Sequence, residues 1–423
     1  MRSKAFYFFI LFISAAFSAR LPAAGEIQSK NSKSTPEPLH IYLDADMTLL
    51  AESGASIKRG IETALAEAGN KIDGRRVEIV VKDHQGNTVR SRRHMEEYLK
   101  DPRALAVFSG LHSPPLLANR DFINENGILV LDPWAAAAPI TRYPSPENWI
   151  FRLSIDDSKA GGVIVDYAMN KKEYQNPALL LEQTGWGESN RKSLTKAIRD
   201  FGFGSPAVIK MFNWNLTENG AKIILRDICT SGADVVFLVA NAPEGKTIAR
   251  AMASLPEGKR LPICSHWGIT GGDFPQEIDA QMREKIKLSF IQTDFSFISS
   301  PQTELSRRVF SLAKSLYPKK IKEPVDIKAP AGFIHAYDLT KILIRAAENA
   351  GLTGDIIIDR AAVRSALENL DRPVEGLIKV YNKPFSEFTE NNPDAHEALN
   401  AEDYVMAHYR RDNAIVFESM YVK

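Results

Sequence analysis

Cysteine is nearly absent from this 423-residue chain, which contains only Cys229 and Cys264. In an oxidising compartment these two residues could form a disulfide, but the sequence does not place their Cα atoms, so their pairing stays open. An excess of one charge is also missing, because 53 Lys and Arg residues stand against 52 Asp and Glu residues. The resulting net charge of +1 gives no support to nucleic acid or an anionic membrane as a partner.

Catalytic signatures are missing as well. The sequence has no HExxH, no GxSxG, no P-loop, no GxGxxG after a strand and no Cys-x-x-Cys. His112 and His266 each stand beside a serine, but neighbours in sequence point different ways from a strand, so neither pair forms a Ser-His dyad by itself. The two histidines could share a metal, yet no third ligand is evident. We therefore expect no enzyme, no cofactor and no metal site.

An apolar run of the length of a secretion signal occurs at the N-terminus. "MRSK" supplies positive charge, "AFYFFILFISAAF" is apolar, and "SARLPAAGE" offers small residues for cleavage. This pattern predicts a signal peptide over residues 1–24 and a polar leader over 25–37, with a membrane anchor as the alternative. No cysteine follows the run, so a lipoprotein is not expected. We expect an exported, soluble protein of the periplasm.

Beyond the leader, apolar segments of strand length alternate with segments of helical periodicity. Strands are expected at residues 39–46, 75–83, 104–109 and 128–133, with helices at 55–68, 88–99 and 114–126 between them. A second series places strands at 177–183, 207–212, 233–240, 261–267 and 285–292, with helices at 188–201, 218–230 and 244–255. Helices at 301–316, 329–349 and 359–369 follow, and the end of the chain reads as antiparallel strands with "RDNA" as a turn.

Near-continuous apolar strands that alternate with helices are typical of parallel sheets covered on both faces. Two such series predict an α/β protein of two doubly wound lobes. Ligands of this class bind beyond the carboxyl ends of the strands, so a cleft between the lobes is the expected site.

The loops at these strand ends hold the candidate ligand-binding residues. Ser113 and the proline after it have the arrangement of an N-cap and first helical residue, which would direct the N–H groups of His112 and Ser113 and the helix dipole at an anion. The alternative is that Ser113 only caps the helix. Trp134, Trp186 and Trp267 fall in three different loops, which favours an aromatic-walled cleft for a flat, apolar or cationic ligand; lobe packing is the alternative.

From residue 39 to 420 the chain resembles the type I periplasmic solute-binding proteins, the leucine/isoleucine/valine-binding family of ABC importers. The resemblance is carried, in family order, by residues 53–87, 106–141, 150–168, 179–189 ("LLLEQTGWGES"), 234–245 and 331–339 ("AGFIHAYDL"). It implies two lobes joined by three crossovers, with a ligand clamped at the hinge. Lobe one would comprise residues 38–153 and 294–372, and lobe two residues 154–293 and 373–423.

The resemblance also implies roles for particular residues. Ser113 aligns with a serine that holds the ligand's carboxylate, Ala135 and Ala136 with a segment that here offers backbone only, and Trp186 and Tyr337 with aromatic contacts. Trp267 stands where amino-acid binders carry an acid that pairs with the ligand's ammonium. Tryptophan cannot supply that charge-assisted bond, which disfavours an α-amino acid. It favours an aromatic carboxylate, an amide or urea-like molecule, or a quaternary amine.

Loop acids could take over recognition of a positive group, and the sequence does not choose among Asp44, Asp46, Asp132 and Glu182. With Asp46 and the loop residue Asn241, the full candidate set is Asp46, His112, Ser113, Trp134, Ala135, Ala136, Trp186, Asn241, Trp267 and Tyr337. The expected function is a receptor that delivers a small molecule to an ABC permease by hinge closure. A sensor feeding a membrane signalling protein is the alternative, and a cleft enzyme is less favoured.

Overall fold

A computed structural model describes residues 37–143, 147–298 and 301–418. The expected signal peptide and all but the last residue of the expected leader lie outside these ranges. In the described ranges, every helix is too short or too polar to cross a bilayer.

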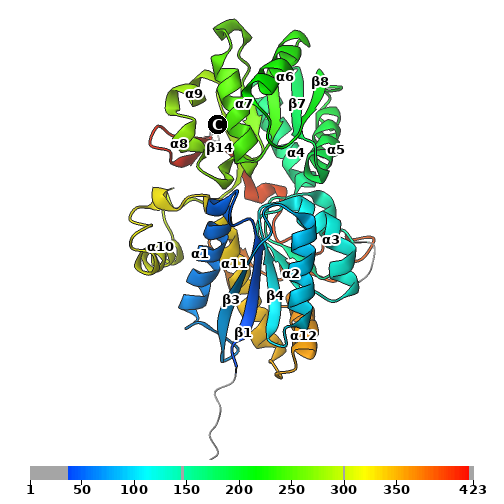
Figure 1. Ribbon diagram of the computed structural model, residues 1–423, viewed down its shortest axis with the longest axis vertical. Coiled ribbons are helices and arrows are strands. Elements are labelled where there is room, and N and C mark those ends of the chain that lie inside the picture. Colours follow the sequence, from blue (N-terminus) through cyan, green and yellow to red (C-terminus); the bar gives the residue numbers. More distant parts are fainter. Residues whose placement is uncertain (1–36, 144–146, 299–300, 419–423) are drawn as a thin grey trace, which may run out of the picture. The chain divides into compact units, whose positions relative to one another are not determined.

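The first sheet is built from parallel strands wound outward from its centre (Figure 1). Its order is β3 (Arg75–Asp83), β1 (Leu39–Ala45), β4 (Ala104–Ser109), β5 (Val130–Asp132) and β6 (Ile150–Arg152), with β2 (Lys71–Ile72) antiparallel at the edge. Every residue of β1, β4 and β5 is buried, because helices cover both faces of the sheet.

Two groups of helices flank this sheet and complete lobe one. On one side α2 (Thr88–Lys100) packs on α3 (Ser113–Glu125). In the other group α11 (Pro330–Ala350) packs on both α1 (Ala51–Glu67) and α12 (Ile356–Glu368), and α10 (Glu304–Leu316) packs on α1. At Gly60 of α1 a Cβ would lie 2.3 Å from the carbonyl oxygen of Phe333, so α1 and α11 meet backbone to backbone.

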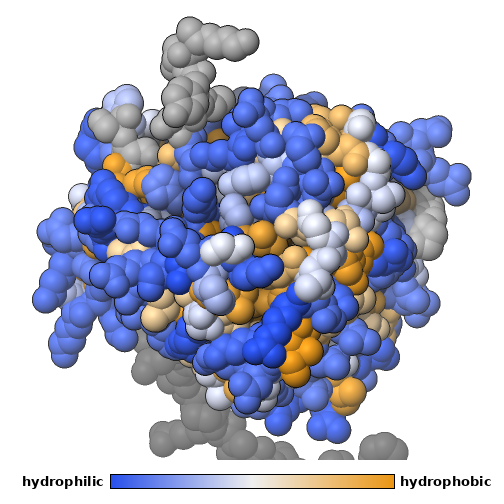
Figure 2. Space-filling view, turned by 90° about the horizontal axis from the view of Figure 1, so that it is seen from above, coloured by the Kyte–Doolittle hydropathy of each residue, from blue (hydrophilic) through white to orange (hydrophobic). Residues whose placement is uncertain are grey.

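The second sheet repeats the same winding order. It runs β8 (Val208–Phe212), β7 (Pro177–Glu182), β9 (Val235–Val239), β10 (Ile263–Ser265) and β11 (Ser289–Thr293) in parallel, followed by antiparallel β14 (Tyr404–Tyr409) and β15 (Ile415–Phe417). Its helices are α4 (Asp157–Val165), α5 (Gly185–Asp200), α6 (Glu218–Thr230), α7 (Ala242–Ser254), α8 (Phe274–Glu277) and α9 (Ala280–Lys285). The end of the molecule seen in Figure 2 is mostly hydrophilic, with hydrophobic residues gathered near its centre.

The predicted α/β class with two parallel-sheet lobes is confirmed. The predicted turn near the end of the chain joins β14 to β15, where the Arg410 N–H donates to the Ala414 carbonyl at 2.8 Å. Strand β6 was not predicted, because its three residues are too few to show a period. The expected strand at 285–292 begins only at Ser289, since residues 280–285 form α9.

A small hairpin follows residue 373, the expected start of the last segment of lobe two. Strands β12 (Val374–Glu375) and β13 (Val380–Tyr381) form a separate hairpin beside α11. Asp338 of α11 holds this hairpin, since its carboxylate accepts from the N–H of Leu377 at 2.6 Å and the hydroxyl of Tyr381 at 2.7 Å. Burial raises the pKa of Asp338 to about 6. The hairpin therefore packs on α11, a helix of lobe one.

Both cysteines are free thiols, so the disulfide that the sequence left open is not formed. Cys264 is buried in β10, where the Ser289 hydroxyl lies 3.4 Å from its Sγ, while Cys229 is half-buried at the end of α6. Burial raises the pKa of the Cys264 thiol to about 12. The thiol therefore stays protonated and unreactive in the folded protein.

Helix α11 brings two residues to the boundary between the lobes. Gly332 packs against the indole of Trp134, where a Cβ would lie 2.6 Å from Cζ3. The His335 ring lies 5.0 Å from that of Trp267, its Nδ1 lies 2.9 Å from the Pro133 carbonyl, and its Nε2 lies 3.0 Å from the Thr293 hydroxyl. His335 therefore links α11 to the end of β11, where the chain leaves lobe two.

Replacing Gly332→Ala should displace the indole of Trp134. The added methyl overpacks the site and should lower the free energy of unfolding by about 1–3 kcal/mol, a loss only partly offset by the roughly 1 kcal/mol gained in helix propensity. Gly162→Ala in α4 is the matched control, because no atom lies within 4 Å of its new Cβ. Urea unfolding followed by circular dichroism measures both, and equal stabilisation of the two variants would contradict this packing.

His335 should make stability depend on pH. Burial lowers its pKa from 6.5 to about 4. Between these two pH values the unfolded chain binds a proton on this histidine and the folded chain does not. The contribution of neutral His335 to the free energy of unfolding is therefore complete above pH 6.5 and is lost as the pH falls toward 4. The loss should reach up to about 3 kcal/mol. His335→Gln should remove this part of the pH dependence, whereas His408→Gln, at an exposed histidine, should not. Identical pH profiles for the two variants would contradict this assignment.

Candidate functional site

The carboxyl ends of the parallel strands in the two lobes face each other across a seam. A small pocket there is lined by Leu111, His112, Ser113, Pro114, Trp134 and Ala136 from lobe one and by Trp186, Asn241, Trp267 and Gly268 from lobe two. Seven of the ten residues predicted from the sequence therefore lie around one pocket. They come from the loops after β4, β5, β7, β9 and β10, as parallel-sheet topology requires.

The seam is closed in this structure. The pocket has a volume of about 10 Å³, roughly the space needed for one water molecule. The Trp134 and Trp267 rings, one from each lobe, lie 5.8 Å apart between centroids, and the Ala138 N–H donates to the Ser189 hydroxyl across the seam at 3.0 Å. An organic solute can enter only if the two lobes separate.

Three indole rings form the apolar part of the seam. Trp134 and Trp267 are each 1% exposed and Trp186 is 5% exposed. The Trp186 Nε1–H donates to Asp157 at 3.3 Å, and its ring meets that of His266 edge to face. Trp214 adds a fourth contact between the lobes, because its ring lies 5.7 Å from that of His112. The tryptophans therefore act both as lobe packing and as the wall of the pocket.

Several polar atoms at or beside the seam are buried without a partner. Among the described residues no hydrogen-bond partner exists for His112 Nδ1, Trp134 Nε1, Asp157 Oδ2 or Asn190 Oδ1. An unpaired buried polar group costs about 1–3 kcal/mol, so their grouping is costly in the closed protein. Such a group of atoms is typical of a site that binds polar molecules.

Ser113 does not cap its helix. His112 is the N-cap of α3, Ser113 is the first helical residue, and neither side chain makes a capping bond. The Ser113 Oγ instead accepts from the Ala137 N–H at 3.2 Å. The N-cap expected at Ser113 is therefore wrong, since the hydroxyl faces the loop after β5.

The loop after β5 presents backbone N–H groups to the seam. The N–H groups of Ala137 and Ala138 donate to the hydroxyls of Ser113 and Ser189, and the Ala136 N–H has no acceptor among the described residues. We call the N–H groups of Ala136–Ala138 and these two hydroxyls the cradle. Two of these N–H groups are bonded to the hydroxyls, so the Ala136 N–H and the two hydroxyl protons remain as neutral donors, which suit an anion such as a carboxylate.

Asp46 and His112 form the polar part of lobe one next to the cradle. The Asp46 Oδ2 lies 3.1 Å from the Nε2 of His112, and its Oδ1 accepts from the N–H of Leu49 at 2.7 Å. Burial would raise the pKa of Asp46, but the hydrogen bonds to His112 and to the backbone outweigh it and hold the pKa at about 2. Asp46 is therefore ionised and fixes the ring of His112 at the pocket.

The other three loop acids are occupied inside their own lobes. Asp44 pairs with His94 at 2.6 Å. Glu182 accepts a hydrogen bond from Asn241 at 3.2 Å, and burial raises the pKa of Glu182. Asp132 accepts from the N–H groups of Trp134 and Ala135. Burial, opposed by nearby Arg152, raises the Asp132 pKa to about 7.

Tyr337 lies away from the seam. Its side chain is fully buried against α1, and its hydroxyl donates to Glu67 at 2.5 Å. The residues of α11 that reach the seam are instead Gly332 and His335, which the sequence analysis did not select. Ala135 lies just behind the pocket wall, with its N–H bonded to Asp132 and its carbonyl to Arg152.

His112 and His266 do not share a metal site. His112 lies beside Asp46, while His266 lies 3.1 Å from Asp157. Across the described parts of the chain there is no group of three or more His, Cys, Asp or Glu side chains that could hold a metal ion.

Sequence reasoning also missed Ser189. Ser189 follows Trp186 on α5 at the i, i+3 spacing. The "GWGES" segment therefore places both side chains on the same side of the helix. That spacing was a usable signal for a second residue at the seam.

Comparison with known proteins agrees with this geometry. A family model described as "Periplasmic binding protein" matches residues 42–393. The Leu/Ile/Val-binding protein homolog 2 of Brucella abortus (strain 2308) is 24% identical over 226 residues, and this match spans 53% of the chain and 58% of the relative.

Solved structures show the same fold. A type 1 periplasmic binding protein from Bordetella pertussis Tohama I superposes with a TM-score of 0.74 at 17% identity, covering 91% of this chain and all of that one. An ABC-transporter solute-binding protein from R. palustris, in complex with 4-hydroxybenzoate, gives 0.71 at 17% identity over 91% and 96% of the two chains. With two parallel-sheet lobes that close on a shared pocket, and a family match over most of its length, this chain belongs to the periplasmic binding protein family.

Proposed function

We propose that this protein is exported to the periplasm and binds a small carboxylate with a flat, apolar body, which it delivers to an ABC permease. The observation that carries the proposal is that Ser113 and Ala136 of the cradle line the same pocket as the three indole rings. The cradle supplies neutral donors for the carboxylate, and the indoles supply aromatic walls for the body.

The loop after β10 argues against an ordinary α-amino acid. Trp267 stands in this loop where amino-acid binders carry an acid, and its indole is 1% exposed. An ammonium group would therefore meet an aromatic face and no carboxylate at this position. Asp157 is the buried acid beside Trp186, and its Oδ1 already receives the Trp186 N–H and lies 3.1 Å from His266. The 4-hydroxybenzoate complex of the R. palustris protein supports an aromatic acid as the ligand class.

Ligand capture requires an open form of the protein. Because the closed pocket holds only about 10 Å³, the solute enters while the lobes are apart and is then contacted by both of them. Residues of both lobes line the pocket, so a bound molecule stabilises the closed state through its extra contacts there. The closed form is the one that a permease would recognise as loaded.

Benzoate should raise the thermal midpoint of the purified protein, whereas isoleucine at the same concentration should not. Ligand that binds only the folded state stabilises it by mass action, so the shift grows with concentration. Differential scanning fluorimetry measures the shift, and mass spectrometry of molecules that co-purify with the protein extends the test to other acids. A shift with isoleucine alone would overturn the proposed ligand class.

Trp267→Ala should weaken benzoate binding at least tenfold, about 1.4 kcal/mol, because it removes one wall of the pocket. Trp149→Ala is the matched control, since this indole packs against Gly127, far from the seam in the fold. Isothermal titration calorimetry gives both affinities. Equal affinities in Trp267→Ala and in the unchanged protein would remove the aromatic wall from the proposal.

Ser113→Ala should weaken benzoate binding and leave benzamide binding nearly unchanged, because only the carboxylate needs the charge-assisted bond. Ser193→Ala controls for loss of a hydroxyl elsewhere, because this half-buried side chain donates within α5 to the Asn190 carbonyl. If benzamide loses affinity as strongly as benzoate, the cradle does not select for negative charge.

A further inference from the structure

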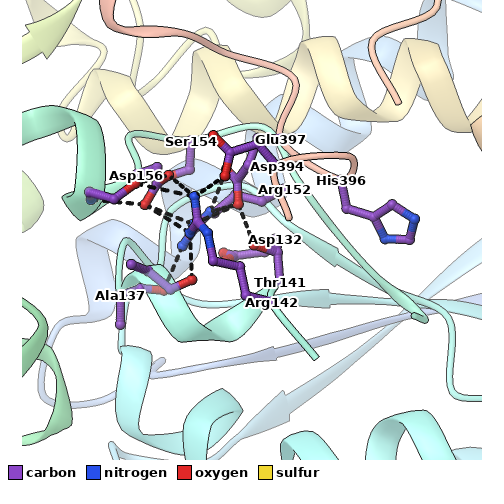
Figure 3. A network of polar contacts seen from close by, with 12 residues as sticks. Asp132, Ala137, Thr141, Arg142, Arg152, Ser154, Asp156, Asp394, His396 and Glu397 are labelled. Atoms are coloured by element: carbon purple, nitrogen blue, oxygen red, sulfur yellow. Dashed lines mark hydrogen bonds and ion pairs between the residues drawn. The ribbon is translucent and has the colours of Figure 1, made fainter. Parts of the chain in front are cut away.

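A fully buried ion network lies where the chain first crosses from lobe one to lobe two (Figure 3). At its centre is Arg152, the last residue of β6. The Arg152 Nη2 and Nε donate to the Glu397 carboxylate at 2.7 and 2.9 Å, and Nη2 also lies 3.3 Å from Asp156. The remaining nitrogen, Nη1, faces the loop after β5.

Through this nitrogen Arg152 fixes the loop that forms the cradle. Its Nη1 donates to the carbonyls of Ala135 at 3.2 Å and Ala137 at 2.9 Å. The carbonyl between them, that of Ala136, accepts from the Asp157 N–H at 2.9 Å. Three successive carbonyls of the loop are therefore held on the crossover side.

The direction of these carbonyls sets the direction of the cradle. In a trans peptide the N–H points opposite to the C=O of the same peptide unit. Holding the carbonyls of Ala135, Ala136 and Ala137 toward the crossover therefore turns the N–H groups of Ala136, Ala137 and Ala138 the other way. Two of these N–H groups indeed meet the hydroxyls of Ser113 and Ser189.

Glu397 brings the third crossover, which returns the chain to lobe two, into the same network. The Ala398 N–H donates to the Arg152 carbonyl at 2.9 Å, and the Arg152 N–H donates to the His396 carbonyl at 2.9 Å. The segment that returns to lobe two is thus paired with the end of β6. Glu397 also accepts from the Thr141 hydroxyl, a few residues after the cradle.

The buried carboxylates of the network are paired with guanidinium groups, which offsets part of the cost of their burial. Arg142 pairs with Asp156 at 2.6 Å, so two guanidinium groups face the buried carboxylates of Asp156 and Glu397. Burial would raise the pKa of Asp156, but Arg152 and Arg142 outweigh it and hold the pKa at about 2. Removing the charge of Arg152 would leave both carboxylates without this partner, which is strongly destabilising, so the test below keeps that charge.

We propose that Arg152 is a positioning residue that aims the N–H groups of the cradle at the ligand's carboxylate, and that Glu397 holds it in place from the third crossover. Arg152 does not line the pocket and does not act as a counter-ion for the ligand. The inference rests on the proposed function in one respect only, namely that the cradle receives a carboxylate.

Lysine cannot replace arginine in this role. The guanidinium carries five N–H donors in a rigid planar fork, which lets one side chain serve a carboxylate and two carbonyls together. A lysine ammonium keeps the charge but is a single point on a flexible stem. Arg152→Lys therefore separates the loss of geometry from the loss of charge.

The test compares Arg152→Lys with Arg360→Lys in the full protein. Arg360 is a matched control, because it is also buried and donates to backbone carbonyls, those of Ala104 at 2.7 Å and Tyr98 at 3.1 Å, within lobe one. Two readouts are taken, the affinities for benzoate and benzamide by calorimetry, and hydrogen–deuterium exchange of the segment 134–140.

Arg152→Lys should lower the benzoate affinity at least tenfold, change the benzamide affinity less than twofold, and speed exchange in residues 134–140 at least tenfold. Arg360→Lys should change none of these. Should Arg152→Lys fail to fold, Glu397→Gln replaces it, with the same changes expected in smaller size. Equal losses for both ligands, or unchanged exchange in the segment, would overturn the positioning role.

The two proposals can fail separately. If the unchanged protein binds neither benzoate nor any other carboxylate tested, the proposed function fails and the exchange measurement alone decides the role of Arg152. If benzoate binds and Arg152→Lys binds it equally well, the function stands and the positioning role is overturned.

Discussion

Parallel strands that enter one sheet must all end at the same edge, and this constraint places the candidate residues that lie at the seam. Both sheets are wound outward from their first strand, so the loops after β1, β4 and β5 share one edge and those after β7, β9 and β10 share another. The two edges meet at the seam, where loops that are far apart in sequence contact each other. The three tryptophans, Ser113 and Ala136 share a pocket because of this topology, not because of their spacing along the chain.

The closed seam is a balance between opposing contributions. Burial of three indoles and the bond between Ala138 and Ser189 favour contact between the lobes. The unpaired atoms of His112, Trp134, Asp157 and Asn190 oppose it. A receptor that closed too firmly without its solute would weaken its own affinity, because only the open fraction binds. The unpaired polar atoms limit that loss.

The fold was predictable because its signals are local. Apolar runs such as those of β1, β4 and β9 are buried along their whole length, and the alternation with helical periods fixes the α/β class. Trp134, Trp186 and Trp267 were found because each follows a strand. Tyr337 was misplaced, because its position came from a resemblance, while the actual helix turns it toward Glu67 and presents His335 to the seam. The pairing of Arg152 with Glu397 joins residues 245 positions apart, so no local pattern in the sequence predicts it.

The route of the chain also determines when each lobe can be finished. The first sheet needs α11 and α12 to cover it, and the edge of β11 stays open until β14 arrives. A chain that emerges N-terminus first therefore cannot cover the first sheet before α12 is available, or complete the second sheet before β14 is available. Such late completion delays compaction of both lobes until most of the chain has been synthesised.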